Sequence, residues 1–307
     1  MNSGKKFGVM ILFFDCEQFI LKTIENCAPF VDKIYISYSP QPWSAYNAEA
    51  PSLYANRSNP EILKQSVYFD KLELVQGVWE TEEAQRNACR TKAIADGMDY
   101  LIVQDADEFY LPETYQQNID EILANPQYNM YQCPWMIFWK DTKHVILHRE
   151  HLGERNTIYA ACPLFAINLH VDNPFTSRRL TKDIDNKLIL QGMCFHLSYV
   201  FSDEEMVRKI NTWGHSHQVN KNWLRWKWLA WNPQTKYLNP FNSTQWIKAV
   251  PYTGKLPKEL IDFPTPPQTI IPLSLLEQIK CNWQDTISLG SFQLRQLSKQ
   301  VKRLLKN

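Results

Sequence analysis

The first hundred residues alternate between short apolar runs and stretches with helical periodicity, and this alternation restricts the fold more than any other feature of the chain. Residues 7–14 form a continuous apolar run of strand length, and apolar residues recur at helical spacing over residues 17–27. Residues 33–38, 72–76 and 100–104 have the pattern of further strands. Strands that alternate with helices predict right-handed crossovers and an α/β fold, with a mostly parallel central sheet flanked by helices.

Capping residues indicate where two of the helices begin. Thr81 is placed to cap a helix over residues 81–95, and Gly97 lies just past its end. Ser202 and Glu205 form a capping box, because the Ser202 hydroxyl can accept from the backbone N–H of Glu205 while Glu205 reaches back. We therefore expect a second helix over residues 203–213.

The pattern changes in the second half of the chain. Several segments resemble strands that are separated by turns rather than by helices: residues 130–139, 144–149, 158–169 and 188–200. We expect a mixed or antiparallel sheet here that continues the first domain to residue 217. Residues 218–307 are assigned to a Trp-rich and Pro-rich C-terminal extension.

The extension is expected to end in an amphipathic helix. Pro264, Pro266, Pro267 and Pro272 predict an extended tail before it. The last fifteen residues place Leu294, Leu297, Val301, Leu304 and Leu305 on one face, with Arg295, Lys299, Lys302, Arg303 and Lys306 as unbalanced charges. Two interpretations stay open: a helix docked on its own domain, or a helix that contacts a membrane surface or a partner.

Composition excludes several classes of protein. With 33 Lys and Arg against 32 Asp and Glu, and 44% hydrophobic residues, the chain is neither disordered nor globally basic, so no nucleic-acid partner is expected. Its seven cysteines are scattered singly, which favours reduced thiols and a cytoplasmic location without a signal peptide. The sequence has no G-x-G-x-x-G and only nine glycines, which argues against dinucleotide oxidoreductases and P-loop enzymes.

The most informative segment is an apolar strand that ends in Asp105, Asp107 and Glu108. Open α/β sheets bind their ligands at the carboxyl ends of their strands. Neighbouring aspartates stay ionised at low cost only where a cation neutralises them. Hard oxygen ligands select Mg²⁺ or Mn²⁺. The alternative is a solvated acidic turn.

The stretch Asp105-Ala106-Asp107-Glu108 resembles the DxD motif of nucleotide-sugar glycosyltransferases with the GT-A (Rossmann-like) fold, in particular family-2-like members. Other segments match that family in order: Asp15-Cys16-Glu17, Phe30-Val31-Asp32-Lys33-Ile34, and Trp79-Glu80 followed by Gln85-Arg86-Asn87. Downstream, Phe195-His196-Leu197-Ser198-Tyr199-Val200 with Glu205-Met206, Lys209 and His215 resembles the histidine and helix that close the family's catalytic domain. The resemblance covers roughly residues 5 to 217.

This resemblance implies metal-dependent transfer of a sugar from a nucleotide-diphosphate sugar to a glycan, glycolipid or protein acceptor, as in polysaccharide biosynthesis. It implies Mn²⁺ or Mg²⁺ bound by Asp107, with Asp105 as a contact to the metal or to the ribose and His196 as a third metal ligand or a contact to the diphosphate. The expected donor contacts are Asp15, Glu17, Arg86, Asn87, Asp105 and Lys209. An inverting reaction would also need a carboxylate base, for which Glu108, Asp172 and Asp203 are candidates.

Two departures from the family leave the donor nucleotide open. Asp15 stands where the family usually has Asn, and Ser37-Tyr38-Ser39-Pro40 replaces its acidic Asp-x-Ser-x-Asp segment. The aromatic insertion over residues 43–54 is an alternative stacking surface for the base.

Rival interpretations rest on other residues. His144, His148 and His151 resemble a metal site, but no acidic or cysteine ligand accompanies them, which favours a surface strand. Trp223, Trp226, Trp228 and Trp231 are suited either to core packing or to an acceptor sugar or a membrane interface. A phosphohydrolase with an Asp nucleophile is disfavoured, because Phe109 stands where such enzymes have Thr or Val. A non-catalytic module that binds a nucleotide sugar or a glycan remains the alternative.

Overall fold

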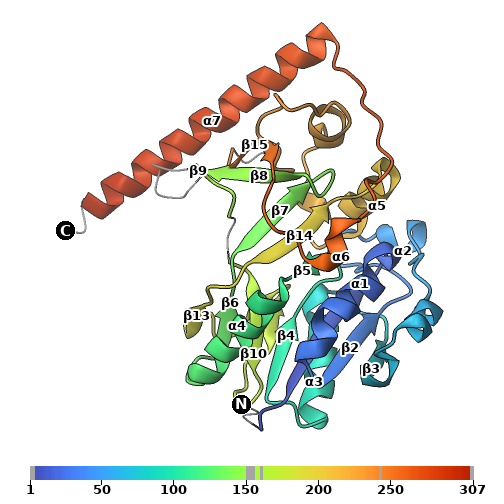
Figure 1. The fold of residues 1–307 in the computed structure, drawn as a ribbon. Coiled ribbons are helices and arrows are strands. Elements are labelled where there is room, and N and C mark those ends of the chain that lie inside the picture. Colours follow the sequence, from blue (N-terminus) through green and yellow to red (C-terminus); the bar gives the residue numbers. More distant parts are fainter. Residues whose placement is uncertain (1–3, 150–155, 160–161, 242–243, 305–307) are drawn as a thin grey trace.

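The computed structural model describes residues 4–149, 156–159, 162–241 and 244–304, with residues 295–296 and 299–304 described by their backbone alone (Figure 1). Its centre is a seven-stranded sheet with the order β13-β6-β10-β4-β1-β2-β3. Four parallel strands form one half: β1 (Phe7–Phe13), β2 (Lys33–Tyr38), β3 (Leu72–Gln76) and β4 (Tyr100–Val103). Three more complete it: β10 (Leu164–Asn168), antiparallel to β4 and β6, then β6 (Met130–Gln132) and β13 (Lys187–Ile189). This confirms the predicted α/β class.

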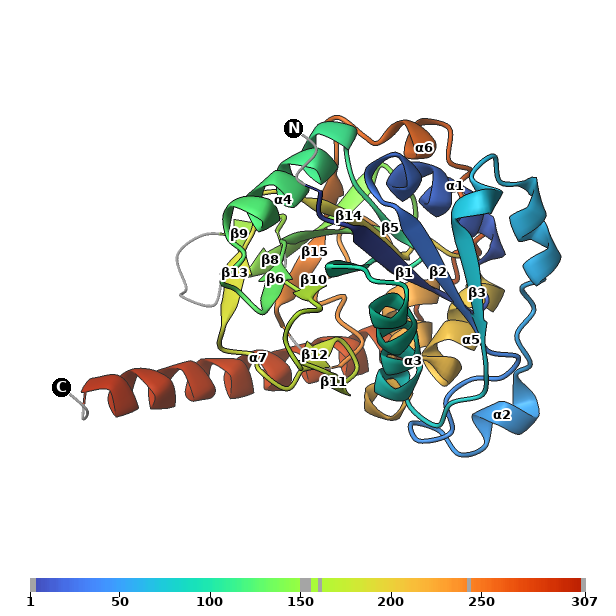
Figure 2. The same ribbon diagram turned by 90° about the horizontal axis from the view of Figure 1, so that it is seen from below.

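Helices cover both faces of this sheet, because alternate strand residues point to opposite sides. Helices α1 (Glu17–Cys27) and α4 (Pro112–Ala124) lie on one face, where Ile11 and Ile102 are fully buried (Figure 2). Helix α3 (Glu82–Ala95) lies on the other face against Met10 and Leu101. The Thr81 hydroxyl accepts from Ala84 N at 3.2 Å, which confirms the predicted start of α3.

A second sheet stands beyond the carboxyl ends of the parallel strands (Figure 1). It has the order β15-β8-β7-β14-β5, with β9 (Asn156–Thr157) paired to β8. The strands are β5 (Glu108–Phe109), β7 (Trp135–Trp139), β8 (His144–Arg149), β14 (Cys194–Tyr199) and β15 (Trp246–Pro251). The single strands predicted over residues 130–139 and 188–200 are each two strands that belong to different sheets. In the first, Pro134 has no N–H to continue the ladder.

The remaining elements are short, apart from α5 and the C-terminal helix. They are α2 (Ala50–Leu53), the hairpin of β11 (Phe175–Ser177) and β12 (Leu180–Thr181), α5 (Asp203–Thr212), α6 (Lys258–Ile261) and α7 (Leu275–Leu304). The capping box at the start of α5 is confirmed, because Ser202 Oγ accepts from Glu205 N and Glu205 Oε2 accepts from Ser202 N.

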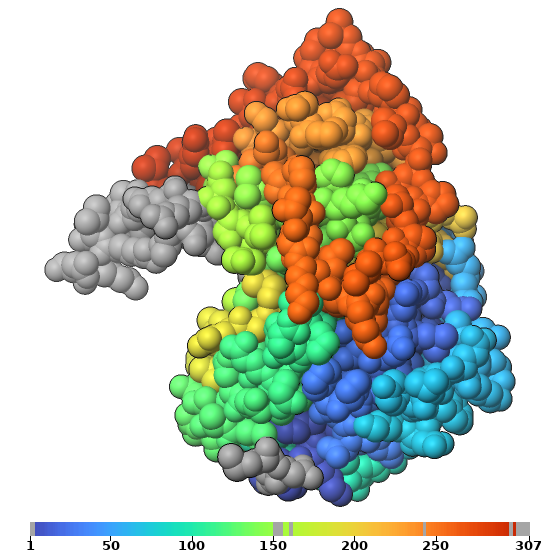
Figure 3. All heavy atoms as spheres, viewed as in Figure 1, coloured from blue at the N-terminus to red at the C-terminus, as the bar shows by residue number. Residues whose placement is uncertain are grey.

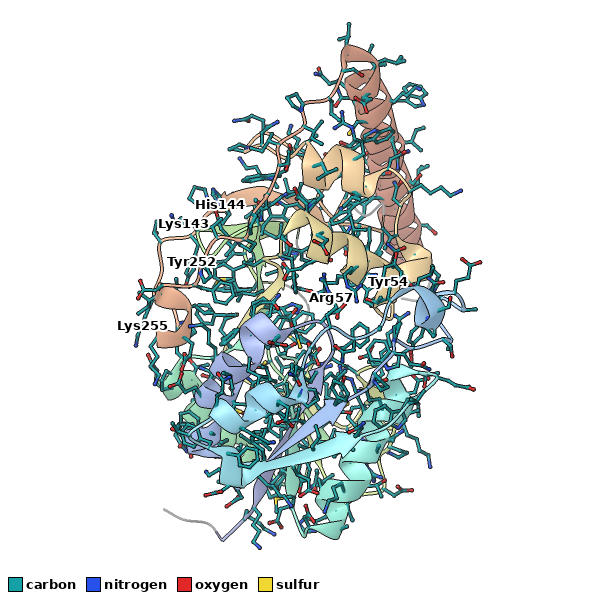
Figure 4. The ribbon with its side chains drawn as sticks, turned by 90° about the vertical axis from the view of Figure 1, so that its right-hand side faces the viewer. Tyr54, Arg57, Lys143, His144, Tyr252 and Lys255 are labelled. Carbon is teal, nitrogen blue, oxygen red and sulfur yellow. The ribbon has the colours of Figure 1, made fainter. Side chains whose placement is uncertain are left out.

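The C-terminal extension shares the core of the preceding residues. Strand β15 pairs with β8, and Tyr252 lies beside Lys143 and His144 (Figure 4). Trp223 and Trp228 are buried against Trp139. Strand pairing and aromatic packing thus connect the segments on either side of residue 217, and a domain boundary at that residue stays a prediction.

The last part of the chain runs over the surface. From β15 it descends to α6, then returns upward as the predicted extended, proline-rich segment before α7 (Figures 1 and 3). Helix α7 begins at Leu275, well before the last fifteen residues for which a helix was predicted. No helix within the described ranges is long and apolar enough to cross a membrane.

Candidate active site

A cavity of about 560 Å³ opens at the carboxyl edge of the central sheet. Its floor is the turn after β4, which carries Asp105 and Asp107, and the loop after β1, which carries Asp15. Asp15 has a φ of 48°, a left-handed conformation that bends the chain sharply as it leaves the strand. The cationic residues in the lining are Arg57, Arg86, Arg178, Arg179, Arg208 and Lys209, together with His196 and His215 when protonated.

Asp105 is held between two arginines. Its Oδ1 accepts from Arg86 at 2.9 Å, and its Oδ2 accepts from Arg179 at 3.1 Å. Burial by itself would raise the pKa of Asp105, but the charges of Arg86 and Arg179 hold it below the usual value. Arg86 is itself 1% exposed and paired with Glu82 at 2.8 Å. The carboxylate therefore stays ionised and fixed in orientation.

Glu108, a candidate base, lies in a buried ion pair. Its side chain is fully buried, does not line the cavity and is bridged to both terminal nitrogens of Arg179. It also accepts from the backbone N–H of Asp105 at 3.1 Å. In this structure the Glu108 carboxylate stabilises the turn that contains Asp105. It does not line the cavity in which an acceptor hydroxyl would bind.

Asp107 faces the cavity with two basic partners. Lys209 Nζ donates to its Oδ2 at 2.9 Å, and His196 Nε2 lies 3.5 Å from its Oδ1. Burial opposes ionisation, but Lys209 and His196 lower the pKa of Asp107 well below its ordinary value. His196 comes from β14 and Lys209 from α5, so the structure brings three predicted site residues from separate segments together.

The predicted donor contacts divide into two groups. Asp15 lines the cavity, where Arg208 donates to its Oδ2 at 2.7 Å and Arg57 N donates to its Oδ1 at 2.8 Å. Arg57 lies next to Tyr54, beside α5 (Figure 4). Glu17 and Asn87 do not line the cavity.

Glu17 and Asn87 hold loops instead of contacting a ligand. Glu17 Oε2 accepts from Asn59 N at 2.8 Å. The amide of Asn87 makes both hydrogen bonds to the backbone of Phe175, at 2.8 and 2.9 Å. Asn87 thereby ties the start of β11 to α3 and positions the hairpin that delivers Arg179.

The other candidate bases also lie outside the cavity lining. Asp203 accepts from Trp228 Nε1 at 2.7 Å and from Thr269 N at 2.6 Å, so it joins α5 to the C-terminal segment. Asp172 is mostly exposed and is paired with Arg90. Asp203 as a catalytic base stays a prediction, and in this structure its carboxylate takes part in tertiary packing.

Sequence reasoning identified Arg86 but missed two other arginines near the acidic turn. Arg178 and Arg179 form the tip of the β11–β12 hairpin, and Arg178 has a φ of 50°. Arg179 reaches Asp105, Glu108 and two backbone carbonyls. Two adjacent arginines in a short turn were the only sign of this role in the sequence. Arg179 contacts Asp105, which lies more than seventy residues away along the chain.

Several donors in the cavity lining have no partner among the described residues. They are Arg86 Nη1, Arg178 Nε, Arg179 Nε, Trp135 Nε1, Trp213 Nε1 and His196 Nδ1. Buried donors of this kind are costly unless a ligand or water accepts from them. The cationic side chains of the lining suit a ligand rich in acceptor oxygens.

The side chains fit a divalent cation in part. Asp107 Oδ1 and His196 Nε2 lie 3.5 Å apart. Carboxylate oxygen and imidazole nitrogen are both ligand types that coordinate Mn²⁺. Asp105 does not join them, since both of its oxygens are occupied by arginines. Across the part of the chain that the structure describes, no three His, Cys, Asp or Glu side chains gather as metal ligands do. The predicted ligand set of Asp105, Asp107 and His196 stays a prediction.

The remaining clusters have structural roles. His148 is buried against Trp246, and His144 contacts Asp141 at 2.9 Å, while His151 lies outside the described residues. Trp223 and Trp228 are core residues, as their packing against Trp139 shows.

Comparisons with known proteins give a limited result. No protein-family model matches the sequence, and no curated protein matches it. Among solved structures, the chain is similar to residues 1–349 of S. aureus TarS, with 13% identity, a TM-score of 0.41, and coverage of 73% of this chain and 71% of that chain.

Two further structures are similar over a smaller part. One is glucosyl-3-phosphoglycerate synthase from Mycobacterium tuberculosis in complex with Mn²⁺, uridine diphosphate and phosphoglyceric acid, with 14% identity, a TM-score of 0.31 and coverage of 43% and 44%. The other is mannose-1-phosphate geranyltransferase from Thermus thermophilus, with 14% identity, a TM-score of 0.32 and coverage of 53% and 50%. The match spans half or less of these two proteins. Likenesses of this strength assign no activity to the chain.

Proposed function

We propose that this chain is a metal-dependent glycosyltransferase that moves a sugar from a nucleotide-diphosphate sugar to a glycan, lipid or protein acceptor. One observation carries the proposal: Asp105 and Asp107 stand at the carboxyl end of β4, in a cavity whose lining also carries cations from α3, α5 and the β11–β12 turn. Cations complement a diphosphate. The cavity volume of about 560 Å³ is in the range that small ligands and cofactors occupy.

The proposed reaction follows from these charges. The acceptor hydroxyl oxygen forms a bond to the anomeric carbon while the bond from that carbon to the diphosphate breaks. The leaving diphosphate takes the bonding electron pair, and the hydroxyl proton passes to solvent. Negative charge develops on the leaving diphosphate, where Lys209 and Arg178 stabilise it. A divalent cation held by Asp107 and His196 would supply further Lewis-acid stabilisation of this charge.

Other residues in the lining position the donor. Arg86 and Arg179 fix the orientation of Asp105. Trp43 lines the cavity and is oriented by a 2.7 Å hydrogen bond to Gln85. Its indole is the proposed stacking surface for the base, in agreement with the aromatic insertion noted in the sequence.

The proposal is tested by calorimetric titration with UDP-, GDP-, TDP- and CMP-sugars, each with and without Mn²⁺. We expect one nucleotide class to bind in a Mn²⁺-dependent manner, and Asp107→Asn to lose the dependence on Mn²⁺. Asp172→Asn is the matched control, because that carboxylate is exposed and remote from the cavity. Mn²⁺-independent binding of a nucleotide sugar without turnover of the donor would instead support a non-catalytic binding module. No binding in any combination would contradict the proposal.

A cytoplasmic location is also proposed. All seven cysteines are unpaired thiols, and six of them are buried. A set of free thiols of this size is typical of proteins kept in a reducing compartment.

A further inference from the structure

Helix α7 is attached to the body of the protein through polar contacts. Lys227 Nζ lies 2.7 and 2.8 Å from the two carboxylate oxygens of Asp285, and Arg225 donates to Glu277 at 2.8 Å. Further along, the Arg149 guanidinium lies 5.6 Å from the centre of the Phe292 ring. The side of α7 that faces the protein is therefore held mainly by ion pairs and a cation–π contact.

The outward side of α7 carries a row of large apolar side chains. Each of them is more than half exposed: Leu276, Ile279, Trp283, Ile287, Leu294 and Leu297. Successive members are three, four or seven residues apart, so at 3.6 residues per turn they occupy a sector of about 80°. This sector, which we term the outer stripe, lies opposite Cys281, which is buried against the body.

This arrangement is the reverse of a helix that packs on its own domain. An amphipathic surface helix usually buries its apolar side chains and exposes its polar ones. Here the polar contacts face inward and the outer stripe faces solvent along a helix that extends well beyond the body of the protein (Figure 2). A continuous exposed apolar surface of this kind marks an interaction site.

The charge of the same segment indicates the partner. From residue 286 to residue 307 the sequence contains five cations and no acidic residue: Arg295, Lys299, Lys302, Arg303 and Lys306. Trp283 within the outer stripe is a residue type that favours the boundary between water and lipid. An anionic surface complements these unbalanced cations.

We propose that α7 binds the surface of a membrane that contains anionic lipids, with the outer stripe inserted between the headgroups. Apolar insertion and electrostatic attraction add in this mode, as they do in other interfacial helices. The inference rests on α7 alone and does not depend on the proposed transferase activity.

The test is flotation of the full chain with lipid vesicles. We expect it to float with phosphatidylcholine vesicles that contain phosphatidylglycerol, to bind pure phosphatidylcholine much more weakly, and to dissociate at high salt. Ile287→Ser combined with Leu294→Ser should weaken binding at least about tenfold through lost apolar insertion. Lys299→Gln and Lys302→Gln should each weaken it about fivefold.

A matched control uses exposed apolar residues outside α7. Leu53→Ser combined with Val67→Ser should leave binding unchanged, since both side chains are exposed and belong to other segments. Circular dichroism melting of each variant shows that the fold persists. Absence of flotation with anionic vesicles, or equal flotation of the stripe variant, would overturn the inference. So would a dimer in light scattering that the stripe variant abolishes, which would assign the outer stripe to a second copy.

Discussion

Lys209 reaches across 102 residues of sequence to place its Nζ 2.9 Å from Oδ2 of Asp107. The same ammonium group donates to Ser198 Oγ at 2.9 Å and lies 4.4 Å from the centre of the Phe201 ring. The Asp107 carboxylate is therefore paired with the ammonium group of Lys209. A metal ion at Asp107 and His196 would share the carboxylate with this lysine.

Lys209→Met should tighten Mn²⁺ binding to the ligand-free protein roughly tenfold, which corresponds to about 1.4 kcal/mol. The reason is that the ammonium competes with a divalent cation for the Asp107 carboxylate. Isothermal titration with Mn²⁺ measures the change. Lys64→Met serves as the control, because Lys64 is exposed and paired only with Glu61. An unchanged Mn²⁺ affinity in Lys209→Met would show that the metal does not bind at Asp107.

Arg179→Met should cost about 3–5 kcal/mol in the free energy of unfolding, because it leaves Glu108 buried without its cation. Urea denaturation followed by circular dichroism measures this cost. The double variant Arg179→Met, Glu108→Leu removes the stranded carboxylate and should recover much of the loss.

The matched control for this prediction is Arg57→Met. Arg57 and Glu204 are paired at 2.6 Å, but both side chains are largely exposed, so the loss should be below about 1 kcal/mol. If the double variant were no more stable than Arg179→Met, the ion pair with Glu108 would not be the cause.

Acid should destabilise the protein in part through His148. Burial lowers the pKa of His148 from its ordinary value of 6.5 to about 4. The unfolded chain therefore binds more protons between these two pH values, and stability falls as the pH is lowered from about 6.5 to about 4, by at most about 3 kcal/mol. His148→Leu should flatten this part of the stability curve. The same substitution at exposed His170 should leave the slope in place, and a slope unchanged by His148→Leu would refute the assignment.

Asp203→Asn should affect stability and leave the chemistry unchanged. The loss of charge weakens the hydrogen bonds from Trp228 and Thr269, at a cost of about 1–2 kcal/mol. The rate of donor turnover should stay within about twofold of wild type, since a general base contributes on the order of 100-fold or more. Paired melting and turnover measurements separate the two effects. A large fall in turnover with little change in stability would restore Asp203 as a candidate base.

Local patterns in the sequence predicted much of the first half of the fold. The bounds of α1 and β2 agree with their helical and strand patterns, and the Thr81 and Ser202 caps stand where expected. These features depend on neighbours within a few residues, which the sequence displays directly. The second half of the fold was harder to predict from the sequence. Pro134 divides a continuous apolar stretch between two sheets, and strands in mixed sheets pair with partners far away along the chain.

The candidate site was predictable in its acidic turn and only in part elsewhere. Asp105, Asp107, Arg86, His196 and Lys209 were named from the sequence and lie together in the cavity. The role of Arg179 was missed, and the sequence did not show that Glu108 and Asp203 make tertiary structural contacts outside the cavity lining. A carboxylate looks the same in a sequence whether it points into a cavity, as Asp107 does, or into a buried ion pair, as Glu108 does.

The sequence by itself determined the alternation of strands and helices, their caps, and the acidic turn that follows β4, because these depend on local periodicity and on steric preferences of the backbone. Only the tertiary structure decided which charges neutralise that turn. Arg179 and Lys209 come from segments far along the chain, and a hydrogen bond of about 3 Å between such segments depends on how the whole core packs. Packing likewise decided that α7 turns its apolar side outward, because the residues that hold its inner face lie on other elements.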